Sequence, residues 1–213
     1  ETVCMGYGGV DSYDFHALET AQCLSERRRG GETGIRNCIA LKGDALWSYL
    51  ATSDRAQTRR LMAAALSRSH NLPVDGGYMT GAVDFEWLRK TMGSTIGYFY
   101  EHNDGHRTSM FLAPIQDFNV AVLRADGRIE STQMYLPMPT HGSTTADFFN
   151  PLCRHIEDIV LGKPLPYPPE RTLLTSGMTL AAVESLHQGG KLIPTPQMNV
   201  RYTVGKGSTY WRG

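Results

Sequence analysis

The segment Thr95–Leu136 reads TIGYFYEHNDGHRTSMFLAPIQDFNVAVLRADGRIESTQMYL, and it decides the fold class of this chain. Two of its turns, Asn103-Asp104-Gly105 and Ala125-Asp126-Gly127, are typical of β-hairpins. Consecutive hairpins predict an antiparallel meander, and the period of two among its apolar residues predicts one buried face. The four expected strands are Thr95–His102, His106–Ala113, Asp117–Arg124 and Arg128–Leu136.

Helical patterns flank this segment in the sequence. The expected helices are Phe15–Arg29, Asp44–Tyr49, Ser53–Ser69, Asp84–Lys90, Thr145–Leu161 and Glu170–His187, and two further strands are expected at Glu1–Met5 and Ile35–Leu41. The apolar residues of the Thr145–Leu161 helix are expected to face the core. The order predicts an α+β fold, in which a predominantly antiparallel open sheet has its helices packed on one face. We expect a single domain over residues 1–213, without a Rossmann domain.

Composition excludes several classes of function. The chain has 213 residues, with 21 Lys plus Arg and 21 Asp plus Glu, and this zero net charge argues against a general nucleic-acid binder. Apolar runs of about 18 residues are absent, so no membrane association is expected. The four cysteines form no C-x-x-C pair and the histidines do not cluster, so we expect no metal site and a reduced, cytoplasmic setting.

The candidate site lies in the segment Gly6–Glu19, where glycines are followed by a titratable cluster and then by a helical pattern. Gly8 and Gly9 allow sharp turns or close approach of a ligand. An imidazole titrates near neutral pH, so His16 is the candidate catalytic acid or base. Asp14 and Ser12 could orient it.

Other residues of the same segment are candidates for substrate binding. Tyr13 could contact a sugar-like ligand, although a buried packing tyrosine is the plainer interpretation. Glu19, one turn beyond His16, could hydrogen-bond the imidazole or form a salt bridge. Asp14 could equally serve only as a helix N-cap. His102 and His106, on either side of a hairpin turn, are predicted to be exposed polar residues.

Several of these segments resemble the glucose-fructose oxidoreductase and inositol dehydrogenase (Gfo/Idh/MocA) family. Gly8-Gly9 followed by His16-Ala17-Leu18-Glu19 resembles the glycine-rich H-x-x-D segment of that family. The closing part of its C-terminal domain is similar to an ordered set in this chain: Phe148-Phe149, Ile156-Glu157-Asp158-Ile159-Val160, Gly162-Lys163-Pro164, a helix from Glu170 to Ser185, and Gly189-Gly190-Lys191-Leu192-Ile193.

The resemblance implies a C-terminal domain that holds a small-molecule substrate and forms a homo-oligomer through its sheet face. NAD or NADP would be bound mainly by a Rossmann domain, in a preceding segment or a partner chain. The absence of an initiator Met also leads us to expect the later part of a longer protein or a processed subunit. The sequence departs from the family at Ser12, where the family has Asp, and it has no counterpart of the family's E-K-P lysine.

Three hypotheses of function follow. The first is the substrate-binding and oligomerisation domain of an NAD(P)-dependent oxidoreductase acting on a small sugar, polyol or related hydroxy or keto compound. The second is a non-catalytic binding or scaffold subunit, which the two departures favour. The third is a cofactor-independent lyase or isomerase that uses His16 and Asp14.

Overall fold

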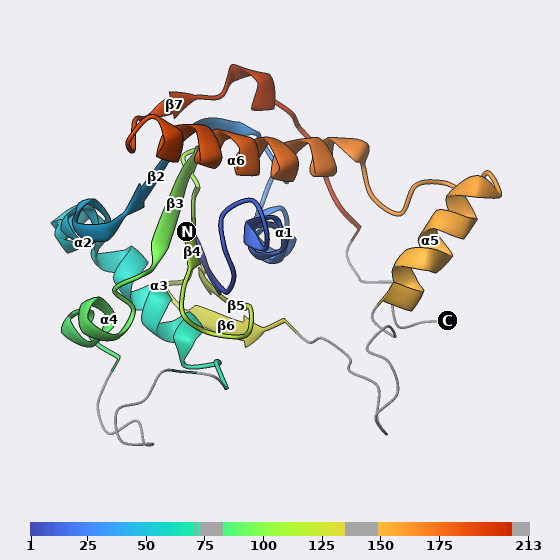
Figure 1. Ribbon diagram of the computed structural model, residues 1–213. Coiled ribbons are helices and arrows are strands. Elements are labelled where there is room, and N and C mark those ends of the chain that lie inside the picture. Colours follow the sequence, from blue (N-terminus) through green and yellow to red (C-terminus); the bar gives the residue numbers. More distant parts are fainter. Residues whose placement is uncertain (71, 73–82, 135–148, 206–213) are drawn as a thin grey trace.

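The computed structural model describes residues 1–70, 72, 83–134 and 149–205. These residues form a seven-stranded sheet in the order β6-β5-β1-β4-β3-β2-β7 (Figure 1). The strands are β1 (Thr2–Gly6), β2 (Ile35–Lys42), β3 (Ile96–His102), β4 (Arg107–Leu112), β5 (Asn119–Leu123), β6 (Ile129–Gln133) and β7 (Ile193–Pro194). β1 and β4 pair parallel, and the remaining neighbours pair antiparallel. The predicted α+β class with a predominantly antiparallel sheet is confirmed.

The predicted meander is wrong at its centre. The two hairpins are present, because β3 pairs with β4 and β5 pairs with β6. β4 and β5 are not neighbours, however, since β1 lies between them, parallel to β4 and antiparallel to β5. Hairpin signals act over a few residues. They cannot report that a strand from the start of the chain enters the sheet between two hairpins.

Helices cover both faces of the sheet, so the prediction of helices on one face is wrong. α1 (Asp14–Ser25) and α6 (Pro169–His187) pack on one face, where the core includes Leu18, Tyr98 and Met178. α2 (Gly43–Ala51), α3 (Ala56–Leu66) and α4 (Phe85–Thr91) pack on the other. Figure 1 shows α1 and α6 on the side of the sheet opposite α2, α3 and α4.

The central strands have apolar side chains on both faces of the sheet, so each face needs a covering layer of helices. Tyr98 and Tyr100 of β3 enter the core beneath α1 and α6, while Phe99 between them enters the core beneath α2 and α3. Side chains alternate between the faces of a strand, and a strand buried on both faces reads as a continuous apolar run. The run Tyr98-Phe99-Tyr100 is such a signal. The sheet face through which we expected a homo-oligomer contact is therefore not bare, because helices cover it.

Helix α5 (Asn150–Val160) differs from the other helices. The predicted helix is present in this range, with Pro151 in its first turn, where proline is tolerated. Residues 145–148 of the prediction lie outside the described residues. The expectation that its apolar side points to the core is wrong, because α5 has no buried residue and Leu152, Ile156 and Ile159 are exposed. Figure 1 shows α5 beyond the N-terminal end of α6.

Two further observations concern the class of protein. Across the described part of the chain, no helix has both the length and the apolar character needed to cross a membrane. All four cysteines are free thiols. Cys4 and Cys38 are buried, whereas Cys23 and Cys153 lie at the surface.

Candidate functional site

The candidate site is a loop at the end of β1, which we call the His16 loop and define as Tyr7–His16. β1 and β4 are parallel, so their carboxyl ends meet at one edge of the sheet and the segments that follow them are neighbours. Tyr7 follows β1, and its ring centroid lies 5.0 Å from that of Phe118, which comes after β4. The topology therefore brings the start of α1 together with the β4–β5 connection.

Glycine is required at Gly8 of this loop but not at Gly9. Gly8 has a φ of +94°, and a Cβ added there would lie 2.6 Å from Cδ2 of Tyr13. A Cβ added at Gly9 would have no other atom within 4 Å. Asp11 also has a positive φ, of 55°, which is uncommon for a residue with a side chain. Something in the loop must hold Asp11 in that conformation.

The buried carboxylate of Asp14 holds Asp11 in this conformation. Its Oδ2 accepts the N–H of Asp11 at 2.9 Å, and its Oδ1 accepts those of Ser12 at 3.2 Å and Phe15 at 3.0 Å. The hydroxyl of Tyr98 donates to Oδ2 at 3.1 Å. Burial raises the pKa of Tyr98 far above its ordinary value, and the negative charge of the Asp14 carboxylate raises it further, so this hydroxyl keeps its proton. Asp14 is thus the centre of the loop, and the N-cap position belongs to Tyr13.

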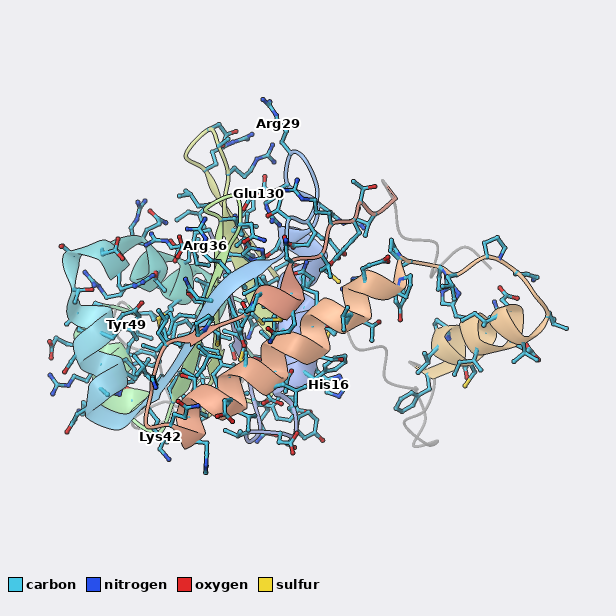
Figure 2. The ribbon with its side chains drawn as sticks, turned by 90° about the horizontal axis from the view of Figure 1, so that it is seen from above. His16, Arg29, Arg36, Lys42, Tyr49 and Glu130 are labelled. Carbon is cyan, nitrogen blue, oxygen red and sulfur yellow. The ribbon has the colours of Figure 1, made fainter. Side chains whose placement is uncertain are left out.

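His16 remains at the surface next to three aromatic rings. Its ring centroid lies 5.8 Å from that of Tyr13, 6.1 Å from that of Phe15 and 6.4 Å from that of Phe118. Among the described residues, no group hydrogen-bonds the His16 imidazole, although Thr20 donates to its backbone carbonyl. Figure 2 shows the His16 side chain at the margin of the layer formed by α1 and α6. Both ring nitrogens are therefore available to a ligand from solvent.

The other predicted site residues divide into two groups. Gly9, Ser12 and Tyr13 are exposed, and of these three Tyr13 contacts the His16 ring. Tyr13 contacts the rings of Tyr7 and His16 but is exposed, so the interpretation of Tyr13 as a buried packing residue is wrong, and its contact with a ligand stays a prediction. Glu19 is turned away, because its carboxylate forms an ion pair with Arg171 of α6, which corresponds to the salt-bridge alternative. Neither Asp14 nor Ser12 orients the imidazole through a hydrogen bond within the described residues.

Sequence reasoning missed Tyr98, Tyr7 and Phe118 as parts of the site. The period of two in β3 placed Tyr98 correctly on a buried face. Nothing local indicates that its hydroxyl reaches a carboxylate 84 positions earlier in the chain. Phe118 gives no signal either, since its approach to Tyr7 depends on the parallel pairing of β1 with β4.

The same loop is unsuited to a dinucleotide diphosphate. Backbone N–H groups at a helix N-terminus are the usual cradle for phosphate. Here the N–H groups of Asp11, Ser12 and Phe15 already donate to the Asp14 carboxylate, whose charge would repel an anion. A neutral ligand with hydroxyl groups suits this surface better than an anionic one. Within the described ranges, no three His, Cys, Asp or Glu side chains come together as metal ligands.

A second polar cluster lies at the C-terminal end of α1 and centres on Glu32. Glu32 Oε1 accepts N–H groups of Thr33 at 2.8 Å and Gly34 at 2.9 Å, and it lies 3.0 Å from Nη2 of Arg28 and 2.8 Å from Nδ1 of His102. Burial by itself raises the pKa of Glu32, but the bonds from His102 and Arg28 outweigh it and hold that pKa well below the ordinary value.

His102 is enclosed in this cluster, so the prediction that it is an exposed polar residue is wrong. Its Nε2 lies 2.8 Å from Oγ1 of Thr108, and its side chain has no exposed surface. His106 is also largely enclosed, with Nε2 lying 3.1 Å from Oγ1 of Thr2. Burial, followed by nearby positive charges, lowers the pKa of His106 from 6.5 to about 2. Both nitrogens of His102 are engaged, so we assign this histidine a structural role.

Arg171 connects α6 to this end of α1. Its Nε donates to Oε2 of Glu26 at 2.9 Å, and its Nη1 pairs with Glu19. The Tyr202 hydroxyl donates to the same Glu26 oxygen at 3.0 Å. Burial raises the pKa of Glu26. These contacts fix α1 along its length, and the helix carries His16 in its first turn.

Three of the cavities that described residues line have no residue of the His16 loop among their lining residues. A cavity of about 520 Å³ lies along α5, one of about 440 Å³ lies beside β6, and one of about 390 Å³ lies near Glu26 and Arg27. We place the candidate site at His16 on chemical grounds, because the three cavities contain no available imidazole.

No family model matches the chain, and a search of curated proteins finds no match either. What the geometry defines is an α+β domain with a mostly antiparallel sheet and a rigid loop that presents a histidine to solvent.

Proposed function

We propose that this chain is the substrate-binding and oligomerisation domain of an NAD(P)-dependent oxidoreductase that acts on a small sugar, polyol or related hydroxy or keto compound. The observation that carries the proposal is the His16 imidazole, which has no hydrogen-bond partner among the described residues, on a loop fixed by Asp14. Rigid placement of an acid or base is what general acid–base catalysis requires. In this role His16 takes the proton of a substrate hydroxyl or returns it to a carbonyl oxygen.

The surface around His16 supports the proposed class of ligand. The rings of Tyr13 and Phe118 provide apolar surface, and the Ser12 hydroxyl and the imidazole provide hydrogen-bonding groups. The carboxylates of Asp11 and Asp14 disfavour an anion. We propose that the nicotinamide cofactor binds to a domain outside this chain.

The exposed apolar face of α5 supports the assembly part of the proposal. Leu152, Ile156 and Ile159 recur at intervals of four and three residues, and all three are exposed. A helix of 11 residues gains little stability in water from its own hydrogen bonds. Contact with another protein surface, either a second copy or a further domain, would stabilise it.

The decisive experiment is a dehydrogenase assay of the full-length protein with NAD or NADP and a panel of myo-inositol, D-glucose and other neutral polyols. We expect His16→Ala to lower turnover by about 10²–10⁴-fold. The matched control is His187→Ala, which removes another exposed helical histidine, in the last turn of α6. Equal turnover by wild type and His16→Ala would remove His16 from the chemistry.

One observation favours a second candidate, a non-catalytic binding subunit. Within the described residues no carboxylate hydrogen-bonds the His16 imidazole, because Asp14 is committed to the loop backbone and Tyr98. This alternative predicts polyol binding without turnover. The third hypothesis, a lyase or isomerase using His16 with Asp14, gains no support, since the Asp14 carboxylate is buried and fully engaged.

A further inference from the structure

The hydroxyl of Tyr98 joins the sheet to the His16 loop. Tyr98 lies in β3 with no exposed surface, and its ring is part of the core beneath α1 and α6. Its hydroxyl donates to Oδ2 of Asp14 at 3.1 Å. A buried hydroxyl aimed at a buried carboxylate has a defined direction, because each group would be costly to leave unpaired.

The same carboxylate oxygen also stabilises the left-handed backbone conformation of the loop at Asp11. Oδ2 of Asp14 also accepts the N–H of Asp11, whose φ of 55° lies in the left-handed region. Without the Tyr98 hydroxyl, Oδ2 would retain one partner in a dry site, and the carboxylate would gain by rotating toward water. The bonds to Asp11 and Ser12 depend on the present orientation of that carboxylate.

We propose that Tyr98 is a positioning residue for the His16 site. Its hydroxyl fixes the Asp14 carboxylate, the carboxylate fixes Asp11 and Ser12, and the loop then holds Tyr13 against His16. Tyr98 itself does not touch the ligand. The statement that this geometry serves ligand binding rests on the proposed function, whereas the statement that Tyr98 sets the geometry does not.

Tyr100 provides a matched control in the same strand. It lies two residues from Tyr98 on the same face of β3, and it is equally buried. Its hydroxyl donates to a backbone carbonyl, that of Met178 in α6, at 2.9 Å. Tyr98→Phe and Tyr100→Phe therefore each remove one buried, hydrogen-bonded hydroxyl, but only the first removes a bond to the loop.

The test is amide hydrogen exchange by NMR on the complete chain, with the exchange of Asp11 and Ser12 compared with that of the core strand residue Met110. Relative to Met110, we expect exchange at Asp11 and Ser12 to accelerate by about tenfold or more in Tyr98→Phe. Tyr100→Phe should leave this ratio within about twofold of wild type. The nuclear Overhauser contact between the Tyr13 and His16 rings should weaken only in Tyr98→Phe. Equal ratios in the two variants, or an unchanged ratio in Tyr98→Phe, would overturn the proposal.

A second measurement separates this proposal from the proposed function. The His16 ring resonances are followed while myo-inositol is added to wild type and to each variant. Weaker binding in Tyr98→Phe, with Tyr100→Phe equal to wild type, supports both proposals. Should wild type respond to no polyol of the panel, the proposed function fails, and the exchange ratio alone then decides the role of Tyr98.

Discussion

Glu32 and Asp14 are two buried carboxylates at opposite ends of α1, and each accepts hydrogen bonds from backbone N–H groups of its own loop. Glu32 accepts the N–H groups of Thr33 and Gly34, and Asp14 accepts those of Asp11, Ser12 and Phe15. They differ in their side-chain partners. Glu32 is bonded to Arg28 and His102, whereas the side-chain partner of Asp14 is the neutral hydroxyl of Tyr98.

The difference explains which histidine is available. At the Glu32 end, the imidazole of His102 lies between the Glu32 carboxylate and the Thr108 hydroxyl, at 2.8 Å from each, and is enclosed as a result. At the Asp14 end, backbone N–H groups and a phenol satisfy the carboxylate, and His16 is left at the surface. A buried histidine beside a carboxylate is therefore a stabilising element here, and the exposed one is the candidate for chemistry.

The largest expected effect is on stability at the Glu32 end. Glu32→Ala leaves Arg28, His102 and two backbone N–H groups without their acceptor in a buried site, and we expect a loss of about 3–5 kcal/mol. Urea unfolding followed by circular dichroism measures it. Glu101→Ala, which removes an exposed partner of Arg36, is the control and should cost at most about 1 kcal/mol. Similar losses in the two variants would contradict the comparison.

The second effect is a dependence of stability on pH that arises at the same end. His106 has its pKa lowered from 6.5 to about 2 in the folded state, because burial disfavours its charged form. The unfolded state therefore binds more protons between these values, and the contribution of His106 is complete above about pH 6.5 and declines on acidification. The slope attributable to His106 approaches about 1.4 kcal/mol per pH unit below pH 6.5.

Glu32 acts in the same direction over a lower range. Its folded pKa lies below its ordinary value, so its contribution is complete above about pH 4.5 and declines as the pH falls further. Urea titrations between about pH 6.5 and 5 separate the two groups, since the contribution of His106 should change there and that of Glu32 should not. His106→Asn should flatten this part of the profile. A slope that persists in the variant would assign the effect to another group.

The smallest expected effect is that of His16 on stability. The side chain is exposed and its ring has no hydrogen-bond partner among the described residues, so His16→Ala should change the free energy of unfolding by no more than about 0.5 kcal/mol. Thermal or urea unfolding of the purified variant provides the measurement. A loss above about 2 kcal/mol would show that the imidazole is a structural group like His102.

Local sequence signals predicted the elements of this fold well. The glycine turns after Asn103 and Ala125 lie between paired strands, and the helices α1, α2, α4 and α6 begin and end within a few residues of their predicted limits. These features depend on the backbone preferences of neighbouring residues. The sequence also identified the loop before α1 as the place where polar groups gather.

Interactions distant in sequence account for what the local signals missed. The insertion of β1 between β4 and β5, and the covering of both sheet faces, depend on pairings across the whole chain. The burial of His102 depends on Glu32, which lies 70 positions away. The role of Asp14 as a loop centre depends likewise on Tyr98.

By itself, the amino-acid sequence determined the α+β class, the hairpins, the turn at Gly8 and the position of His16 at the start of a helix, because these follow from conformational preferences over a few residues. Only the tertiary structure decided which histidine is enclosed and which is accessible. A side chain is buried or exposed according to the elements that pack around it, and long-range strand pairing sets that packing.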